Sequence, residues 1–323
     1  MIQQGYVRRM RRWGIAGIGL LVFMSSALIV WRRGESLTPW IVWGVASAAI
    51  GLSLWRYLAQ PRADHTTGRR LVLFVIGTSL FGISLWTQRN VQIEGLFFGL
   101  LTGVVEGAVI HYLLAKLIGP LLFGRIWCGW ACWVGAILDL LPYRRPNGRC
   151  MPWTQLRLVH FGLSLLLVAG LWLGAGYGLG VIGPVAVLWF LIGNAIYLAS
   201  AIILAIVLGD NRAFCKYLCP ITVPLKLTSR FALLKVKGDS SRCDQDRACE
   251  RVCPMGIRIT DYILANQRVL STECILCQEC INVCDHDVLR LSVGFDRGGL
   301  ELLTDRLTTE EQPAACSGCI DNP

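Results

Sequence analysis

The chain has 323 residues, of which 54% are hydrophobic and 16% are charged, and its formal net charge is +10. Soluble globular proteins contain about 25% charged residues, so this composition excludes an ordinary water-soluble domain and predicts a protein that buries much of its surface in lipid. Fourteen cysteines in a chain this long and apolar argue against a small disulfide-stapled secreted fold, and their short spacings favour metal ligation.

The charged residues divide the chain into two parts. Residues 1–237 hold 23 Lys and Arg against 6 Asp and Glu, whereas residues 238–323 hold 8 against 15. This change predicts a basic, apolar membrane part followed by a polar, acidic C-terminal part, with a boundary near residue 237. Because membrane topology accounts for the basic part, it gives no reason to expect a nucleic-acid partner.

Six apolar stretches are long enough to cross a membrane, which takes about 20 residues of helix. They are Trp13–Val30, Pro39–Leu58, Leu71–Trp86, Ile93–Phe123, Leu158–Gly180 and Val181–Leu208. The expected fold of this part is therefore an all-α bundle of about six transmembrane helices. The first stretch follows four arginines and lacks small residues at a cleavage site, so we expect a retained anchor rather than a cleaved signal peptide.

Positively charged residues fall mostly in loops on one side of the predicted bundle. If the N-terminus lies inside, the outer loops contain only Arg32, Arg33 and Arg89. The positive-inside rule then places both termini in the cytoplasm and the chain in a bacterial inner membrane, as a multi-pass protein. Lys116, near the inner end of the fourth span, is expected to extend its amine toward the lipid headgroups.

A short motif occurs twice, each time after a span that runs toward the inner side. Each copy begins with an arginine, Arg125 or Arg212, followed by any residue, an aromatic residue and Cys-x3-Cys. The cysteines are Cys128, Cys132, Cys215 and Cys219. A spacing of one helical turn places each pair on one face, so the duplication predicts four cysteines together at the inner face. An iron–sulfur cluster, a copper site, a redox dithiol and buried cysteines at packed helix ends all stay open.

The C-terminal part contains the most specific motif of the sequence, a C-x2-C-x2-C-x3-C run. Its cysteines are Cys274, Cys277, Cys280 and Cys284. This spacing is typical of bacterial ferredoxins, in which three cysteines hold one iron–sulfur cluster and the fourth reaches the neighbouring cluster. A zinc site would more often show two separated C-x2-C pairs.

A second run lies upstream and departs from the first at one position, where Asp246 stands in place of a cysteine. The run comprises Cys243, Asp246, Cys249 and Cys253. Crossed ligation predicts two [4Fe-4S] clusters. One would be held by Cys274, Cys277, Cys280 and Cys253, and the other by Cys243, Cys249 and Cys284. Asp246 would be an oxygen ligand or mark a missing iron, and because a carboxylate is harder than a thiolate, that cluster could lose iron to a [3Fe-4S] form. The alternative is a solvated loop acid.

At these residues the chain resembles the NapH/MauN-type membrane ferredoxins, a family that also includes the C-terminal half of NosR. The resemblance covers roughly Leu71–Leu291 and rests on both Cys-x3-Cys motifs, on Pro220 and on the tail cysteines. It implies a multi-span core followed by a two-cluster ferredoxin domain on the cytoplasmic side. It also implies quinol oxidation and electron delivery to a partner oxidoreductase, and relatives include copper-handling proteins for oxidase assembly. Trp133, Asp246 and Asp285 depart from the family pattern.

The expected fold class is therefore a membrane all-α helical bundle with a C-terminal α+β two-cluster ferredoxin-like domain. Four parts are expected along the chain. They are an N-terminal transmembrane hairpin (1–70), a transmembrane core (71–237), a ferredoxin-like domain (238–295) and an acidic flexible tail (296–323).

The leading functional hypothesis is a membrane electron-transfer protein that passes electrons between the quinone pool and a redox partner. The alternative is a copper-handling assembly factor that uses the inner-face cysteines and the clusters for metal reduction. Ionisable residues inside spans are functional candidates by default, so His111 and Glu106 are the candidates for binding a quinone. A haem between His111 and His160 is not expected, because the two lie at different depths. The acidic tail suggests docking on a basic protein partner.

Overall fold

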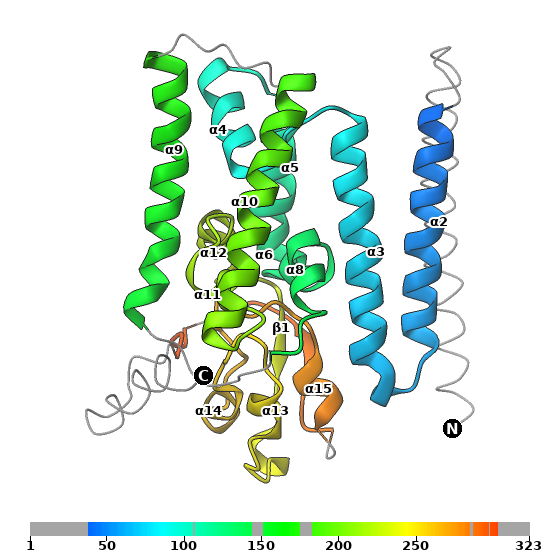
Figure 1. Cartoon of the computed structure of the whole chain (residues 1–323). Coiled ribbons are helices and arrows are strands. Elements are labelled where there is room, and N and C mark those ends of the chain that lie inside the picture. The colour runs from blue at the N-terminus through cyan, green and yellow to red at the C-terminus, as the bar shows by residue number, and fades with distance from the viewer. Residues whose placement is uncertain are drawn as a thin grey trace.

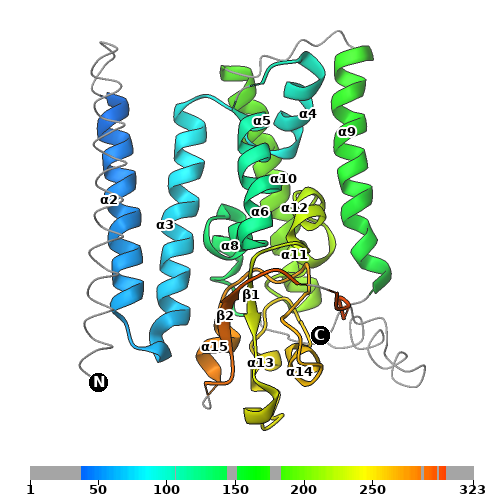
Figure 2. The ribbon, with the colours of Figure 1, turned by 180° about the vertical axis from the view of Figure 1, so that it is seen from behind.

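The computed structural model describes residues 38–105, 107–143, 151–174, 183–284, 287–296 and 298–302. It shows a bundle of long helices with a small domain packed against one end, which we call the docking face (Figure 1). Figure 2 shows from behind that α2 and α3 lie at one side of the bundle and α9 at the other.

Four of the described helices are long and apolar enough to cross a membrane. They are α2 (Thr38–Ala59), α3 (His65–Trp86), α9 (Leu156–Gly174) and α10 (Pro184–Leu208). They correspond to four of the six predicted spans, and the predicted span Trp13–Val30 lies outside the described residues. Large apolar side chains on these helices are exposed, for example Trp43 at 51% and Leu166 at 68%, as expected for surfaces that contact lipid.

The predicted fourth span, Ile93–Phe123, is not one helix. Its first part is α4 (Ile93–Thr102), which ends at Gly103 with a φ of +71°, a left-handed cap that glycine adopts readily. The chain resumes as a second helical segment that comprises α5 (Ala108–His111), the π-helical η2 (Tyr112–Ile118) and α6 (Gly119–Phe123). A helix as short as α4 is about 15 Å long, half of the roughly 30 Å hydrocarbon layer, so α4 cannot cross it.

The half-helix α4 begins in the middle of the bundle. Gln88 lies at the end opposite the docking face, where its carbonyl accepts a hydrogen bond from the backbone N–H of Gly183, next to the start of α10 (2.9 Å). From there the chain descends to Glu94, whose Oε1 accepts hydrogen bonds from Ser164 and Tyr197 (3.0 Å each). Ser164 and Tyr197 lie near the midpoints of α9 and α10, so α4 starts near mid-depth and points back (Figure 1).

A close backbone contact lets the chain turn into α4. Asn90 Oδ1 accepts a hydrogen bond from the backbone N–H of Gln92 (3.0 Å). A Cβ atom placed on Gly95 would lie 1.9 Å from the carbonyl oxygen of Asn90. Any side chain at position 95 therefore has to force this turn apart.

Short elements at the docking face and beneath it carry the cysteine motifs. At the docking face these are α7 (Ile126–Trp130), α8 (Trp133–Leu138), α11 (Ala213–Tyr217) and α12 (Thr222–Ser229). The packed domain contains the antiparallel strands β1 (Leu234–Lys237) and β2 (Arg290–Val293), and the helices α13 (Ala248–Arg251), α14 (Ile259–Leu264) and α15 (Glu279–Val283). Strand β1 precedes the expected boundary at residue 237, so the sheet joins residues from both sides of that boundary.

Buried ion pairs fasten the packed domain to the docking face. Glu273, which is 1% exposed and directly precedes Cys274, pairs with Arg125, with Arg157 (2.9 Å) and with Lys226 (2.7 Å). All three cations belong to the membrane part. Because a buried charge is costly without its partner, Glu273 compensates three cations that would otherwise destabilise this interface.

A second buried network has the same organisation. Glu279 accepts a hydrogen bond from Arg69 of α3 (2.8 Å), and Arg69 also pairs with Asp139 (2.9 Å). Asp139 pairs in turn with Arg212 (2.6 Å). Helix α3, the second copy of the repeat and the cysteine run of the packed domain are therefore connected through one chain of charges.

We expect Gly95→Ala to destabilise the bundle, because the added Cβ meets the Asn90 carbonyl and overpacking costs about 1–3 kcal/mol. Gly170→Ala in α9 is the matched control, since nothing lies within 4 Å of its added Cβ. That control should gain roughly 0.5–1 kcal/mol, because alanine is favoured over glycine inside a helix. Thermal unfolding in detergent, followed by circular dichroism, compares the two. Equal midpoints would contradict the tight turn into α4.

We expect Glu273→Gln to weaken the attachment of the packed domain by about 3–5 kcal/mol, because the buried Arg125 and Arg157 and the half-buried Lys226 lose their anion. Asp287→Asn is the matched control, since Asp287 pairs with Arg62 at an exposed position. Limited proteolysis measures how readily the domain separates from the membrane part. Glu273→Gln should be cleaved much faster than the control, and equal cleavage rates would show that this network does not hold the domain.

Candidate functional site

The two copies of the repeat adopt the same local structure. In each, an arginine precedes a five-residue helix, α7 or α11, whose third residue is the first cysteine, and the second cysteine follows the end of the helix by two residues. Arg125 Nη2 lies 4.0 Å from the sulfur of Cys128, and Arg212 Nη1 lies 3.9 Å from that of Cys215. All four repeat cysteines line one cavity, which we call the bundle cavity: Cys128, Cys132, Cys215 and Cys219.

Positive charge surrounds the bundle cavity. Arg212 and Lys116 line it, and the Lys116 amine lies 4.7 Å from the centre of the Trp127 ring. Arg125 contacts the lining residue Cys128. The prediction that Lys116 extends toward the lipid headgroups is therefore wrong, because its side chain points into the bundle from η2. Cations beside cysteines favour the thiolate form and offset the negative charge of a sulfur-ligated metal centre.

Four tail cysteines line a second cavity directly beneath α7. They are Cys253, Cys274, Cys277 and Cys280. The loop within this set lies against α7, because Trp130 Nε1 donates to the carbonyl oxygen of Leu276 (2.9 Å). A Cβ on Gly129 would lie 2.4 Å from the carbonyl oxygen of Ile275, so only glycine permits this approach of the two backbones. The second cysteine set is therefore held next to the bundle cavity.

The remaining tail ligand candidates line a third cavity. They are Cys243, Asp246, Cys249 and Cys284. Asp246 stands at the rim with its side chain 54% exposed, and its Oδ2 lies 3.6 Å from Arg251. Its Oδ1 accepts a hydrogen bond from the backbone N–H of Ala248 (3.1 Å). Asp246 thus lies beside the three cysteines with which the sequence groups it, and its contacts suit both an oxygen ligand and a loop acid.

The donor atoms of the three sets fit iron–sulfur clusters. Thiolates are soft ligands that bind iron–sulfur clusters and Cu(I). Within the part of the chain that the structure describes, no three His, Cys, Asp or Glu side chains converge closely enough to hold a single metal ion. Each set of cysteines lines a cavity. Burial raises the pKa of Cys249 and of Cys274 to about 11, so metal binding there has to displace protons.

His111, the histidine predicted to bind a quinone, and His160 both lie close to the repeat. His111 lines the bundle cavity, and its ring centre lies 5.7 Å from that of Trp127. His160 Nδ1 lies 2.9 Å from the carbonyl oxygen of Leu218, next to Cys219, so His160 supports the backbone of the second motif. Glu106 lies outside the described residues.

Three polar residues near the bundle cavity escape the sequence analysis. Gln92 and Tyr112, each 1% exposed, line the cavity. Glu94 lies beside it, hydrogen-bonded to Tyr197, which is also a lining residue. An acidic residue within an apolar run is a signal for function, but the position of Glu94 at the start of the predicted span assigns it to the membrane surface.

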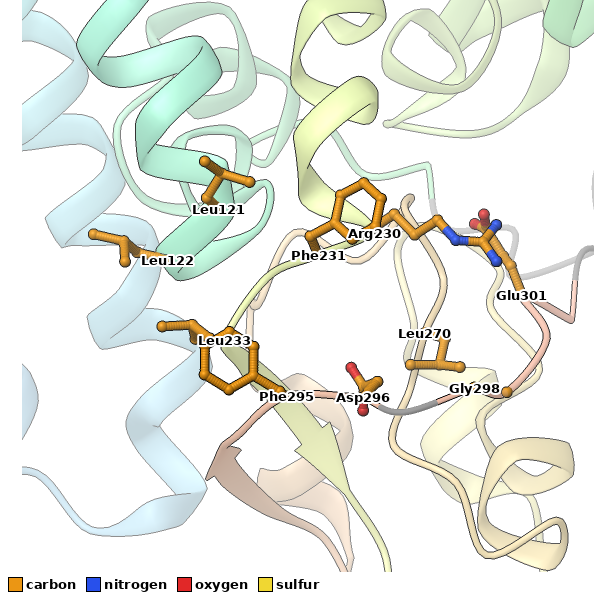
Figure 3. Close-up of a pocket in the computed structure, with 11 residues that line it drawn as sticks. Leu121, Leu122, Arg230, Phe231, Leu233, Leu270, Phe295, Asp296, Gly298 and Glu301 are labelled. Carbon is orange, nitrogen blue, oxygen red and sulfur yellow. The ribbon is translucent and has the colours of Figure 1, made fainter.

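A separate cavity of about 500 Å³ lies between α6, the chain before β1 and the last described residues (Figure 3). Leu121, Phe231 and Phe295 give it an apolar wall. Asp296 at its edge is held by Lys235 (2.7 Å) and Arg268 (2.6 Å). None of the predicted site residues lines this cavity.

Two family models match the chain. A 4Fe-4S binding domain matches residues 108–147 and 191–237, the segments that carry the two Cys-x3-Cys motifs. A 4Fe-4S dicluster domain matches residues 235–285, which carry the tail cysteines. No solved structure matches the chain.

Several proteins are similar over the same region. "Uncharacterized protein MJ0749" of Methanocaldococcus jannaschii is 30% identical over 58% of this chain and 74% of its own length. "Ferredoxin-type protein NapH" of Haemophilus influenzae is 28% identical over 60% and 69%. "Methylamine utilization ferredoxin-type protein MauN" of Methylobacillus flagellatus is 24% identical over 53% and 64%. With its cysteine sets, its four membrane-length helices and these relatives, the chain belongs to the NapH/MauN-type 4Fe-4S ferredoxin family and is a membrane iron–sulfur protein of electron transfer.

Proposed function

We propose that this protein passes electrons between the quinone pool and a protein redox partner through three iron–sulfur clusters in line. The repeat cysteines hold one cluster in the bundle cavity, and the two tail sets hold [4Fe-4S] clusters, of which the one beside Asp246 can lose an iron. The observation that carries the proposal is the order of the three cysteine sets, which runs from the bundle through the α7 contact into the packed domain.

The residues around the sulfurs have defined roles in this proposal. Arg125 and Arg212 contact the first cysteine of each repeat copy, and Lys116 faces the same cavity. These three cations stabilise the negative charge that arrives with an electron, and charge and hydrogen bonds near a cluster set its potential. The clusters, when bound, supply the one-electron chemistry.

The orientation follows from the loops and the packed domain. We place the docking face toward the cytoplasm of a bacterial inner membrane, with both termini on that side, because the basic loop residues lie there. Asp244 and Asp246 are exposed beside the outermost cysteine set. Arg242, Arg247 and Arg251 are exposed there as well. The surface therefore carries charges of both signs, and a redox partner with a complementary charge pattern fits it, because complementary charge guides the encounter of redox proteins.

Electron paramagnetic resonance tests the quinone link. We expect the anaerobically purified protein to show reduced-cluster signals when a reduced menaquinone analogue is added, because residues of the membrane-length helices α3 and α10 help to line the bundle cavity and quinols are apolar molecules. Signals that appear only with a much stronger reductant would exclude quinol as the donor. Bound copper that is lost when all four repeat cysteines are replaced by serine would favour the copper-handling alternative instead.

The Asp246 substitution makes a separate prediction about the outermost cluster. We expect the wild-type protein to lose one iron from this cluster on mild oxidation and to show a [3Fe-4S] signal, because a carboxylate holds iron less firmly than a thiolate. Asp246→Cys should retain four irons under the same treatment. Asp244→Asn, an exposed neighbour, is the control and should behave as the wild type. Iron content and spectra unaffected by Asp246→Cys would show that Asp246 is only a loop acid.

A further inference from the structure

We propose that Glu94 is the proton acceptor for quinol oxidised at the bundle cavity, and that Gln92 and Tyr112 bind the quinol headgroup. This inference rests on the proposed function and assigns its proton chemistry. It involves neither of the residues that the sequence favours for the quinone, His111 and Glu106. Four observations support it: the depth and unpaired oxygen of Glu94, the unpaired polar atoms of Gln92 and Tyr112, the position of Tyr112 in the cavity, and the N-terminus of α4.

Glu94 is an ionisable side chain at mid-depth with one unused oxygen. Its Oε1 accepts hydrogen bonds from Ser164 of α9 and Tyr197 of α10. Its Oε2 is buried and has no hydrogen-bond partner among the described residues. A buried carboxylate oxygen without a donor is costly in a protein interior, and this cost is removed when Oε2 receives a proton or a donor from a ligand.

Gln92 and Tyr112 also have buried polar atoms without a hydrogen-bond partner among the described residues, and they line the same cavity as the repeat cysteines. The amide nitrogen and oxygen of Gln92 and the hydroxyl of Tyr112 are buried, and none has a partner within the described ranges. Both side chains line the bundle cavity. A quinol headgroup offers two hydroxyl groups that donate and accept hydrogen bonds, so it satisfies an amide and a phenol at once. Lipid chains cannot do so.

Tyr112 connects the carboxylate to the redox site. It lines the same cavity as Cys132 and Cys219, and as Tyr197, whose hydroxyl donates to Glu94. A headgroup at Tyr112 is therefore adjacent to both an electron acceptor and a proton acceptor. Quinol oxidation requires both acceptors near the headgroup, because the quinol loses electrons and protons.

The helix end adds a favourable field. Glu94 lies in the first turn of α4, where the unpaired N–H groups and the helix dipole favour a negative charge. The titratable groups that face Glu94 from the packed elements are Tyr112 of η2 and Tyr197 of α10. The ring of His160 of α9 meets that of Tyr197 edge to face, with 5.4 Å between ring centres.

The reaction balances as follows. Oxidation of one quinol to quinone breaks two O–H bonds and releases two electrons and two protons. The electrons leave singly to the cysteine-bound iron–sulfur clusters of the proposed function. Glu94 Oε2 takes the first proton and releases it to water before it takes the second. Proton transfer to a positioned side chain contributes about 100-fold to 10,000-fold to a rate.

Infrared difference spectroscopy on the whole protein tests the assignment. We expect a protonated-carboxylic-acid band to appear when a reduced short-chain quinol is added anaerobically, and we expect this band to be absent from Glu94→Gln. Glutamine retains an oxygen for Ser164 and Tyr197, so the fold should persist, and the iron content and the dithionite-reduced spectra should match the wild type. Cluster reduction by quinol should be at least about 100-fold slower in Glu94→Gln.

Two further variants separate binding from proton transfer. Tyr112→Phe should weaken binding of a redox-inert quinone analogue, measured by quenching of tryptophan fluorescence, and should keep the infrared band. Thr102→Val, at the opposite end of α4, is the matched control and should change neither readout. If Glu94→Gln keeps the band and the rate while wild-type clusters are reduced by quinol, this inference fails and the proposed function stands. If quinol does not reduce the wild-type clusters, both the proposed function and this inference are wrong.

Discussion

Two buried carboxylates, Glu273 and Glu279, determine how the cysteine-rich domain meets the membrane helices. Glu273 compensates Arg125, Arg157 and Lys226, and Glu279 compensates Arg69. Removing an ion from water costs several kcal/mol unless a partner is near, so neither these cations nor these carboxylates are stable in the interface alone. The membrane part and the packed domain therefore complete each other's charge balance, and neither is a self-sufficient unit.

This charge balance also fixes how the cysteine sets lie relative to one another, because the same carboxylates flank the tail cysteines. Glu273 directly precedes Cys274, and Glu279 lies between Cys277 and Cys280. The ion pairs of these carboxylates hold the cysteine run against α7, where Gly129 leaves room for the backbone at Ile275. The arginines of the repeat thus act twice. Each contacts a sulfur of the bundle cavity. Arg125 also pairs with Glu273, and Arg212 is connected to Glu279 through Asp139 and Arg69, so both help to hold the next cysteine set.

The sequence predicts the features that depend on short spacings and misses those that depend on depth. Cysteine spacing is local, and each tail set that it groups lines one cavity in the structure, although ligation itself stays a prediction. Composition and length also predict the four long helices. The break within Ile93–Phe123 escapes, because apolar residues predominate on both sides of it and a half-helix has the same hydropathy as a span. The sequence also does not predict the role of Glu94, because its depth in the bundle is set by tertiary contacts with Ser164 and Tyr197.

The half-helix explains how an apolar protein can hold polar chemistry at mid-depth. Non-helical backbone is tolerated in a membrane only where protein covers it, and the segment before α4 is covered by α10. A Cβ on Gly193 would lie 2.3 Å from Gln92 Oε1, so this glycine makes room for the buried amide. A continuous helix from Ile93 would leave its N-terminal N–H groups at the membrane surface, where water satisfies them. By starting at mid-depth, directly after the lining residue Gln92, α4 places its N-terminus and Glu94 beside the bundle cavity and away from water.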